Sequence, residues 1–263
     1  MINKIKTYID ENRFLKISLI LIGIVSLIVV TRLAIQEKKM AGVKAFHVSI
    51  SYKDKTKRLI SSDYIKDEVR KSLGYNVERI KIKDLDIMKI EDVLDNNDFI
   101  ERAEVYLDGK NVLRVELVQK NPIVRINNGA QKFYLDDKGE YLSLSPVATV
   151  RVPVVTGDIK PYTAEYNKIE GHQFQDIFEL ATKIYKDDFL TSLIEQVHIE
   201  KNGDYLLIPK IGKEKIMLGS VYDLEEKMYK LKVFYKEGLT RLGWGKYAYL
   251  DLKYEEQVVV KSN

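Results

Sequence analysis

The 263-residue chain contains no cysteine, only three histidines and no long run of charges of one sign. Without cysteine the protein forms no disulfide and offers no thiol as a nucleophile or metal ligand. His47, His172 and His198 stand far apart and match no metal-binding spacing such as HExxH. The net charge of +4 is slight, and no basic block indicates binding to nucleic acid. We therefore expect no metal, no other cofactor and no nucleic-acid partner.

One apolar run, from Ile17 to Thr31, contains no charged residue, although 31% of the chain is charged. A helix that crosses the hydrocarbon of a bilayer needs about 20 mostly apolar residues. The run reaches this length as residues 14–35, because Lys16 and Arg32 near its ends have long stems that carry their charges to the headgroups. We predict a tail over residues 1–13 and a transmembrane helix over residues 14–35. Its anchoring residues are Ile17, Leu21, Ile24, Leu27 and Val30.

The apolar run is expected to stay attached rather than to be removed as a secretory signal. A signal has a shorter apolar core and a small-x-small cleavage site, and no convincing site of this kind follows the run. A buried core helix is disfavoured because the run has no polar face. Basic residues nearly balance across the run, so the positive-inside rule decides little. A long body is translocated whatever its charge, so we place the N-terminus in the cytoplasm and the body outside it.

The first part of the body has the pattern of a β-α-α-β-β module. A helical spacing of apolar residues begins near Ser61 and ends at Gly74, and Asp108-Gly109-Lys110-Asn111 is typical of a hairpin turn. Strand patterns cover residues 45–52, 100–107 and 112–118, and helix patterns cover residues 61–73 and 87–94.

After Asn121 the sequence changes to short strands separated by turn residues. Strand patterns cover residues 122–126, 132–135, 141–144, 152–156, 193–200, 205–208, 215–218, 247–254 and 257–260, and helix patterns cover residues 174–185 and 224–234. The predicted fold class is therefore α+β. A single N-terminal transmembrane helix precedes a β-α-α-β-β domain over residues 43–120 and a mostly antiparallel β domain with two helices over residues 121–263.

Five segments follow one another in a recognisable order behind the apolar run. They are Asp98–Val105, Val115–Arg125 with a V.E..P.A-like pattern, Tyr134–Gly139 with a D..G pattern, Val152–Gly157, and Tyr249–Tyr254 with a DLRY-like ending in which Lys253 replaces arginine. Each is weak alone, but together they cover nearly the whole chain. In this order they resemble the bacterial division proteins of the FtsQ family, called DivIB in other lineages. By the same resemblance, the β-α-α-β-β module looks like a POTRA domain.

This resemblance implies a non-catalytic scaffold of the divisome. Such a protein links early septal-ring proteins to the FtsB–FtsL pair, and so to the control of septal peptidoglycan synthesis. It sits in the cytoplasmic membrane at the division septum, in contact with membrane lipid, and other divisome proteins bind through its POTRA-like domain.

The resemblance also implies that an FtsB-like protein adds a strand at the end of the second domain. We predict that the strand pattern over residues 247–254 lies at a sheet edge, where unpaired backbone groups accept another strand. Its aromatic and basic side chains would then set specificity. A second candidate edge is the strand near Ile100–Val105. The predicted partner-binding residues are Tyr247, Tyr249, Leu252, Lys253 and Tyr254.

Three other classes of protein are alternatives to the scaffold. A POTRA-bearing protein of outer-membrane assembly or secretion usually continues into a long run of alternating barrel strands, which this sequence lacks. A second alternative is a cell-wall-binding receptor with one anchor. An enzyme is disfavoured: Asp136-Asp137 lies in a turn pattern, and Glu225-Glu226 opens a helix where acids suit the dipole.

Overall fold

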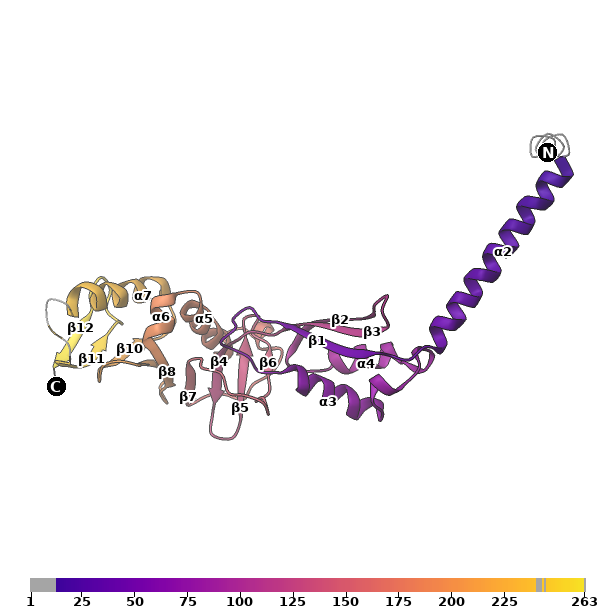
Figure 1. Cartoon of the computed structure of the whole chain (residues 1–263). Helices are drawn as coiled ribbons and strands as arrows, with labels where there is room; N and C mark the ends of the chain where they lie inside the picture. The colour runs from indigo at the N-terminus through magenta and orange to yellow at the C-terminus, as the bar shows by residue number, and fades with distance from the viewer. Residues whose placement is uncertain (1–12, 240–242, 244, 263) are drawn as a thin grey trace. The chain divides into compact units, whose positions relative to one another are not determined.

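The computed structural model describes residues 13–239, 243 and 245–262 (Figure 1). The predicted tail therefore lies, apart from Arg13, outside the described residues. The first element, helix α2, runs over Arg13–Met40 and contains the whole predicted span. No part of its most apolar segment is buried inside the protein.

The polar side chains within α2 bond to the helix itself. Ser18 Oγ donates to the Leu15 carbonyl (3.0 Å), and Thr31 Oγ1 donates to the Leu27 carbonyl (2.7 Å). A helix in hydrocarbon has to satisfy its polar groups internally, so these bonds suit an apolar environment. The predicted anchoring residues Ile17, Leu21, Ile24, Leu27 and Val30 all lie exposed on this helix. The helix is thus consistent with a single membrane span.

A short, bonded connection leads from α2 into the body. Val43 N donates to the Ile80 carbonyl (3.0 Å), Ile82 N donates to the Ala41 carbonyl (2.9 Å), and Gly42 forms a β-bridge with Lys81. These bonds place the next strand only a few residues beyond the helix.

A three-stranded sheet, here called the small sheet, follows with strand order β1-β3-β2. The predicted β-α-α-β-β order is confirmed, with 3-10 turns between the helices. Strand β3 alternates buried and more exposed residues, as expected for a sheet with one face on the core. The elements are β1 (Ala45–Ser51), α3 (Ser62–Leu73), η1 (Val77–Arg79), η2 (Ile82–Asp84), α4 (Ile87–Asp95), β2 (Ile100–Leu107) and β3 (Val112–Gln119).

The β2–β3 hairpin turns at the predicted residues. Asp108 Oδ1 accepts from the backbone N–H groups of Lys110 (2.8 Å) and Val112 (3.0 Å), and Asn111 adopts a φ of 65°. Arg114 Nε donates to the second Asp108 oxygen at 2.8 Å. The Val112 N–H and the Arg114 guanidinium lower the pKa of Asp108 to about 2.

The rest of the chain forms a nine-stranded sheet, here called the large sheet, with order β12-β11-β10-β9-β8-β7-β4-β5-β6. Strand β7 pairs parallel with β4 and β8, β11 pairs parallel with β10, and the other pairs are antiparallel. The predicted α+β class is confirmed. The strands are β4 (Pro122–Asn127), β5 (Lys132–Asp136), β6 (Tyr141–Leu142), β7 (Val154–Gly157), β8 (Ile194–Ile199), β9 (Tyr205–Pro209), β10 (Lys215–Gly219), β11 (Tyr247–Asp251) and β12 (Val259–Ser262).

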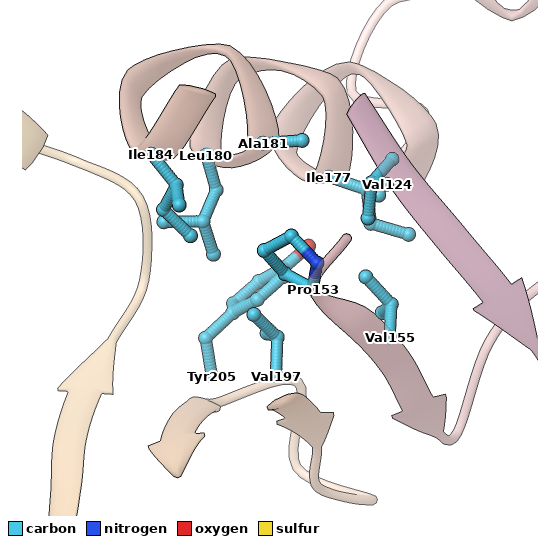
Figure 2. Close-up of a pocket in the computed structure, with 9 residues that line it drawn as sticks. All are labelled: Val124, Pro153, Val155, Ile177, Leu180, Ala181, Ile184, Val197 and Tyr205. Atoms are coloured by element: carbon cyan, nitrogen blue, oxygen red, sulfur yellow. The ribbon is translucent and has the colours of Figure 1, made fainter. Parts of the chain in front are cut away.

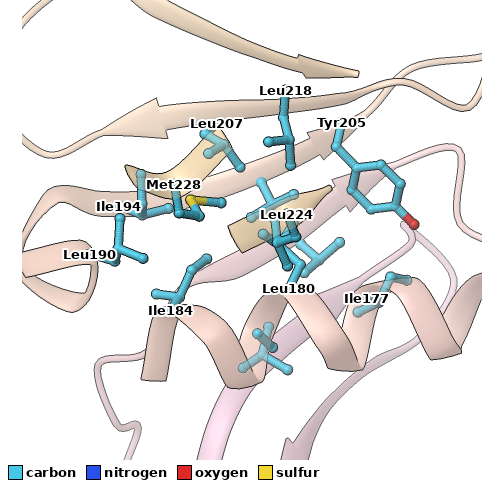
Figure 3. Packing of buried hydrophobic residues seen from close by; sticks show 14 of the residues in the cluster. Ile177, Leu180, Ile184, Leu190, Ile194, Tyr205, Leu207, Leu218, Leu224 and Met228 are labelled. Carbon is cyan, nitrogen blue, oxygen red and sulfur yellow. The ribbon is translucent and has the colours of Figure 1, made fainter. Parts of the chain in front are cut away.

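Helices pack on the large sheet and bury its core. Helix α5 (Gln173–Tyr185) points Ile177, Leu180 and Ile184 toward side chains of the strands (Figure 3). Helix α7 (Leu224–Val233) adds Leu224 and Met228 and continues into a π-helical turn, η4 (Phe234–Gly238), while η3 (Tyr166–Lys168) precedes α5. Beside α5 the core leaves a cavity of only about 10 Å³, lined by apolar side chains and Tyr205 (Figure 2).

The prediction of two helices in this part is wrong, because a third helix, α6 (Asp188–Leu193), precedes β8. Asp187 caps it, accepting from Phe189 N (3.0 Å) and Leu190 N (3.2 Å). Leu190 and Leu193 are buried, one helical turn apart. The strand over residues 193–200 was expected to begin at Leu193. This residue is the last of α6, so β8 starts at Ile194.

The chain divides into two compact units that do not follow chain order. Unit 1 contains residues up to Ser49, Lys66–Leu94 and Glu104–Glu116; unit 2 contains Ile50–Ile65, Asp95–Ala103 and everything from Leu117. The predicted domain boundary after residue 120 stays a prediction.

Ion pairs within unit 2 join its separate segments. Lys53 Nζ lies 3.2 Å from a Glu101 oxygen and 3.1 Å from Asp137, and Lys138 Nζ lies 2.7 Å from Glu101. Lys53 comes from the first of these segments, Glu101 from the second, and Asp137 and Lys138 from the third. The segments Ile50–Ile65 and Asp95–Ala103 are thereby tied to the turn that follows β5 in the large sheet.

Candidate functional site

The C-terminal end of the large sheet is formed by β10, β11 and β12. Strand β11 lies between them, parallel to β10 and antiparallel to β12. The expectation that the strand beginning at Tyr247 is the sheet edge is therefore wrong. Among the described residues the edge strand is β12, and all four of its residues are exposed. Its side away from β11 offers backbone groups to another strand.

The predicted partner-binding residues occupy different environments at this end. Tyr247 is half-buried and packs edge-to-face against Phe234, with 5.9 Å between ring centroids. Tyr249 is 38% exposed on β11, and Tyr254 is 51% exposed beyond the strand. Leu252 is fully buried in the core, so it positions the segment instead of facing a partner.

Strand β11 ends at Asp251, three residues earlier than predicted, because the backbone then turns. Leu252 N donates to the Met217 carbonyl (2.9 Å), and Lys253 N donates to Asp251 Oδ1 (2.9 Å). The Lys253 side chain crosses close to Gly219, where a Cβ atom would lie 2.8 Å from it. Gly219 also has a φ of +70°, so glycine suits this position for two reasons. Lys253 and Tyr254 are thus presented by the turn that leads to β12.

A polar groove of about 310 Å³ lies beside this turn and is lined by residues of α7 and the turn. Lys230 Nζ donates to the Tyr254 carbonyl (2.6 Å) and pairs with Glu226 (3.1 Å). The hydrogen bond from Lys230 lowers the pKa of the Glu226 carboxyl. Lys227 Nζ donates to the Ser220 carbonyl (2.9 Å), and burial lowers the pKa of its ammonium group. Lys253 Nζ lies 3.8 Å from Asp204, so Lys253 is held more weakly than Lys227 and Lys230.

A second, more apolar groove of about 380 Å³ lies between α7, η4 and the residues that lead into β12. Tyr229, which is 67% exposed, Val233, Phe234 and Val258 contribute its apolar wall. This groove was not predicted from the sequence. The sequence feature that indicates the groove is the pair Tyr229 and Val233, which lie four residues apart on α7. They form an apolar stripe beside the buried residues Leu224, Met228 and Leu231.

The other predicted docking edge, the strand near Ile100–Val105, is β2, which does lie at an edge of the small sheet. Its exposed Tyr106 donates to Glu116 Oε1 of β3 at 2.6 Å. The opposite edge strand, β1, has one backbone N–H, that of Phe46, occupied by Glu78 Oε1 (3.1 Å).

Titratable residues outside these edges have structural partners. His172 Nδ1 accepts from Phe174 N (3.2 Å) and caps α5, and His198 Nδ1 lies 3.1 Å from Thr156 Oγ1. In the described part of the chain, no three His, Cys, Asp or Glu side chains gather in a way that would hold a metal ion. The C-terminal end of the large sheet thus combines an open strand edge with two grooves beside it.

Comparison with known proteins gives two family matches. Residues 43–118 match the POTRA-like domain, and residues 121–261 match the family described as FtsQ/DivIB, C-terminal related. Cell division protein FtsQ of Geotalea daltonii is 23% identical over 212 residues, which cover 71% of this chain and 76% of that protein. DNA-directed RNA polymerase subunit beta of Nephroselmis olivacea is 23% identical over 145 residues, but these cover only 13% of that protein.

Proposed function

This chain belongs to the FtsQ/DivIB, C-terminal related, family, and on that premise we propose that it is a non-catalytic, membrane-anchored scaffold of the bacterial divisome. The family membership supports a role in cell division and confirms the resemblance drawn from the sequence motifs. In the proposed role, the chain links early septal-ring proteins to an FtsB-like and FtsL-like pair, and so to the control of septal peptidoglycan synthesis.

The proposed docking mode is strand addition to β12 by the FtsB-like partner. The observation that carries it is the outer side of β12, which no other strand covers among the described residues. Backbone hydrogen bonds along such an edge supply affinity, while pockets beside it supply specificity. Lys253, Tyr254 and Tyr249 lie next to this edge, and the apolar groove beside α7 suits an aromatic or aliphatic anchor.

The proposed topology places the N-terminus in the cytoplasm, α2 across the cytoplasmic membrane and the body in the periplasm or extracytoplasmic space at the septum. The apolar, fully exposed surface of α2 supports the span. The POTRA-like domain would then recruit other divisome proteins, with β2 as its candidate docking edge.

A proline scan of β12 tests the strand addition. Neighbouring residues of an edge strand turn their N–H groups alternately toward and away from the sheet, and proline removes one N–H. Val259→Pro, Val260→Pro and Lys261→Pro are compared with alanine at the same positions, which keeps the N–H. Hydrogen exchange of β11 identifies the proline variants whose pairing with β11 is intact. Those variants should lose the FtsB-like partner in co-purification from dividing cells. If they retain it fully, strand addition at β12 is refuted.

A side-chain test complements the scan. Tyr254→Ala combined with Lys253→Glu removes an exposed aromatic contact and reverses a charge without touching a buried group. We expect at least about a tenfold loss of partner affinity, as is typical for truncating an interface anchor. Lys201→Glu, on the exposed β8–β9 turn, is the matched control. Full affinity of the double variant would remove these two residues from the interface. Absence of both division partners from material isolated with the unmodified chain would refute the scaffold role.

A further inference from the structure

A basic groove lies on the face of the large sheet that α5 and α7 leave open. Arg125 of β4 pairs in register with Val154 of β7. The next residues of both strands, Ile126 and Val155, are buried in the core beneath the helices. Successive side chains of a strand point to opposite faces, so Arg125 and Val154 face away from that core.

The groove has a volume of about 510 Å³ and combines charge with apolar surface. Three valines, from the segment that enters β7, supply its apolar part, and two guanidinium groups and one ammonium group supply positive charge. Glu195 is its single acid. The lining residues are Arg125, Val150, Arg151, Val152, Val154, Glu195 and Lys210.

The positive charges of this groove are not neutralised by ion pairs. Across the described residues, no carboxylate lies within ion-pair distance of Arg125, Arg151 or Lys210. Lys210 Nζ donates to a neutral carbonyl, that of Thr191, at 2.7 Å. The guanidinium of Arg125 lies 5.7 Å from the ring centroid of Tyr134, which is 1% exposed and therefore fixed. The arginine is held in place with its hydrogen-bond donors available for an anion.

We propose that this groove binds an extended acidic segment of a protein partner. Carboxylates of the segment would pair with Arg125, Arg151 and Lys210, because arginine forms two parallel hydrogen bonds with a carboxylate. Apolar side chains of the same segment would lie against the valines. A peptide that carries both acidic and apolar residues uses both parts of the groove, whereas an inorganic polyanion uses only the charges. Val150 is only 6% exposed, so the apolar contact falls mainly on the half-buried Val152 and Val154.

This inference does not depend on the strand addition proposed above. None of the groove residues belongs to β11, β12 or α7. Substitutions in the groove therefore leave the β12 edge unchanged, and the failure of one proposal is distinguishable from the failure of the other.

The test uses the full chain in detergent and a fluorescein-labelled peptide of alternating glutamate and valine. Arg125→Gln with Arg151→Gln should weaken binding about tenfold, because two exposed charge pairs are lost and bidentate pairs are the stronger kind. Arg151→Gln alone, at an exposed position, should give a smaller loss without any effect on folding. Lys186→Gln with Lys201→Gln removes the same charge from exposed positions elsewhere in unit 2 and should bind like the parent.

Two further arms separate the classes of ligand. A peptide of alternating lysine and valine should not bind, and polyphosphate of equal charge should bind more weakly than the acidic peptide at physiological salt, where screening weakens exposed charges. Equal affinity of the groove variant and the control variant would overturn the proposal. Polyphosphate binding as tight as that of the acidic peptide would overturn it as well, since the groove would then recognise charge alone.

Discussion

Replacing Gln119 with leucine should open one buried connection within unit 2. The side chain of Gln119 is 2% exposed and makes four hydrogen bonds to the backbone. Its Oε1 accepts from Leu59 N (2.7 Å) and Ile60 N (3.2 Å), and its Nε2 donates to the carbonyls of Lys57 (2.8 Å) and Lys120 (3.2 Å). Residues 57–60 are thus held to the end of β3 by a single side chain.

The size of the effect follows from these bonds. The bonds to Leu59, Ile60 and Lys57 are buried, and each buried group left without a partner costs roughly 1–3 kcal/mol. Taking the lower part of that range, the three groups cost about 4 kcal/mol. Leucine in place of the amide recovers about 1 kcal/mol through its apolar surface. The net loss of about 3 kcal/mol corresponds to roughly a hundredfold larger equilibrium constant for opening this segment.

Hydrogen exchange of the full chain in detergent, followed by mass spectrometry, measures that opening. Peptides covering residues 57–62 should exchange about a hundredfold faster in Gln119→Leu than in the parent. Gln131→Leu, at an exposed position in the β4–β5 turn, is the matched control and should leave them unchanged. If the two variants exchange alike in this segment, the amide network does not hold it and the reasoning fails.

Three further predictions concern other parts of the chain. The pKa of Asp108 is lowered to about 2, below the ordinary value of about 3.9, so the stability that it gives the hairpin should be present above about pH 4 and lost as the pH falls toward 2. Asp108→Asn should abolish this pH dependence in an NMR titration of the turn. Ile177→Ala should enlarge the cavity beside α5 and reduce the free energy of unfolding by about 3 kcal/mol, measured by denaturant titration. Because the chain has no cysteine, Asn3→Cys and Lys201→Cys each introduce a single thiol, and only the thiol at position 201 should react with a membrane-impermeant maleimide outside intact cells.

Local signals in the sequence predicted most of the elements. The uncharged run from Ile17 to Thr31 predicted α2, because an apolar run of this length without a polar face is typical of a membrane-spanning helix. The Asp108-Gly109 turn fixed the ends of the hairpin, and β2 has the predicted bounds, Ile100–Leu107. The helix α6 was missed because its buried pair, Leu190 and Leu193, is too short to display a period. The Asp187 cap was its only distinct signal.

Predicting the candidate site required pairings between distant residues, which no local pattern contains. Tyr247–Tyr254 has the period of one strand, but the Asp251 side chain accepts a hydrogen bond from Lys253 N, and this local turn ends the strand at Asp251. Likewise, the parallel pairing of β11 with β10 and the return of β12 decide which strand is the edge. The aromatic and basic residues near the edge were predicted from the sequence, but the strand that carries Tyr247 and Tyr249 lies one position inside the edge. The basic groove was not predicted, because Arg125, Arg151 and Lys210 come together only once the sheet has formed.

The connection after α2 determines how this helix acts on the strand that follows. Residues 41–44 are bonded through Ala41, Val43 and Lys44 to Ile82, Ile80 and Asn111, so few backbone dihedrals are free to absorb a twist. A helix joined in this way transmits a rotation about its axis to the next strand, whereas a flexible linker would not. In the proposed membrane span, a neighbouring transmembrane helix that fixes the rotation of α2 about its own axis would therefore also fix the rotation of β1.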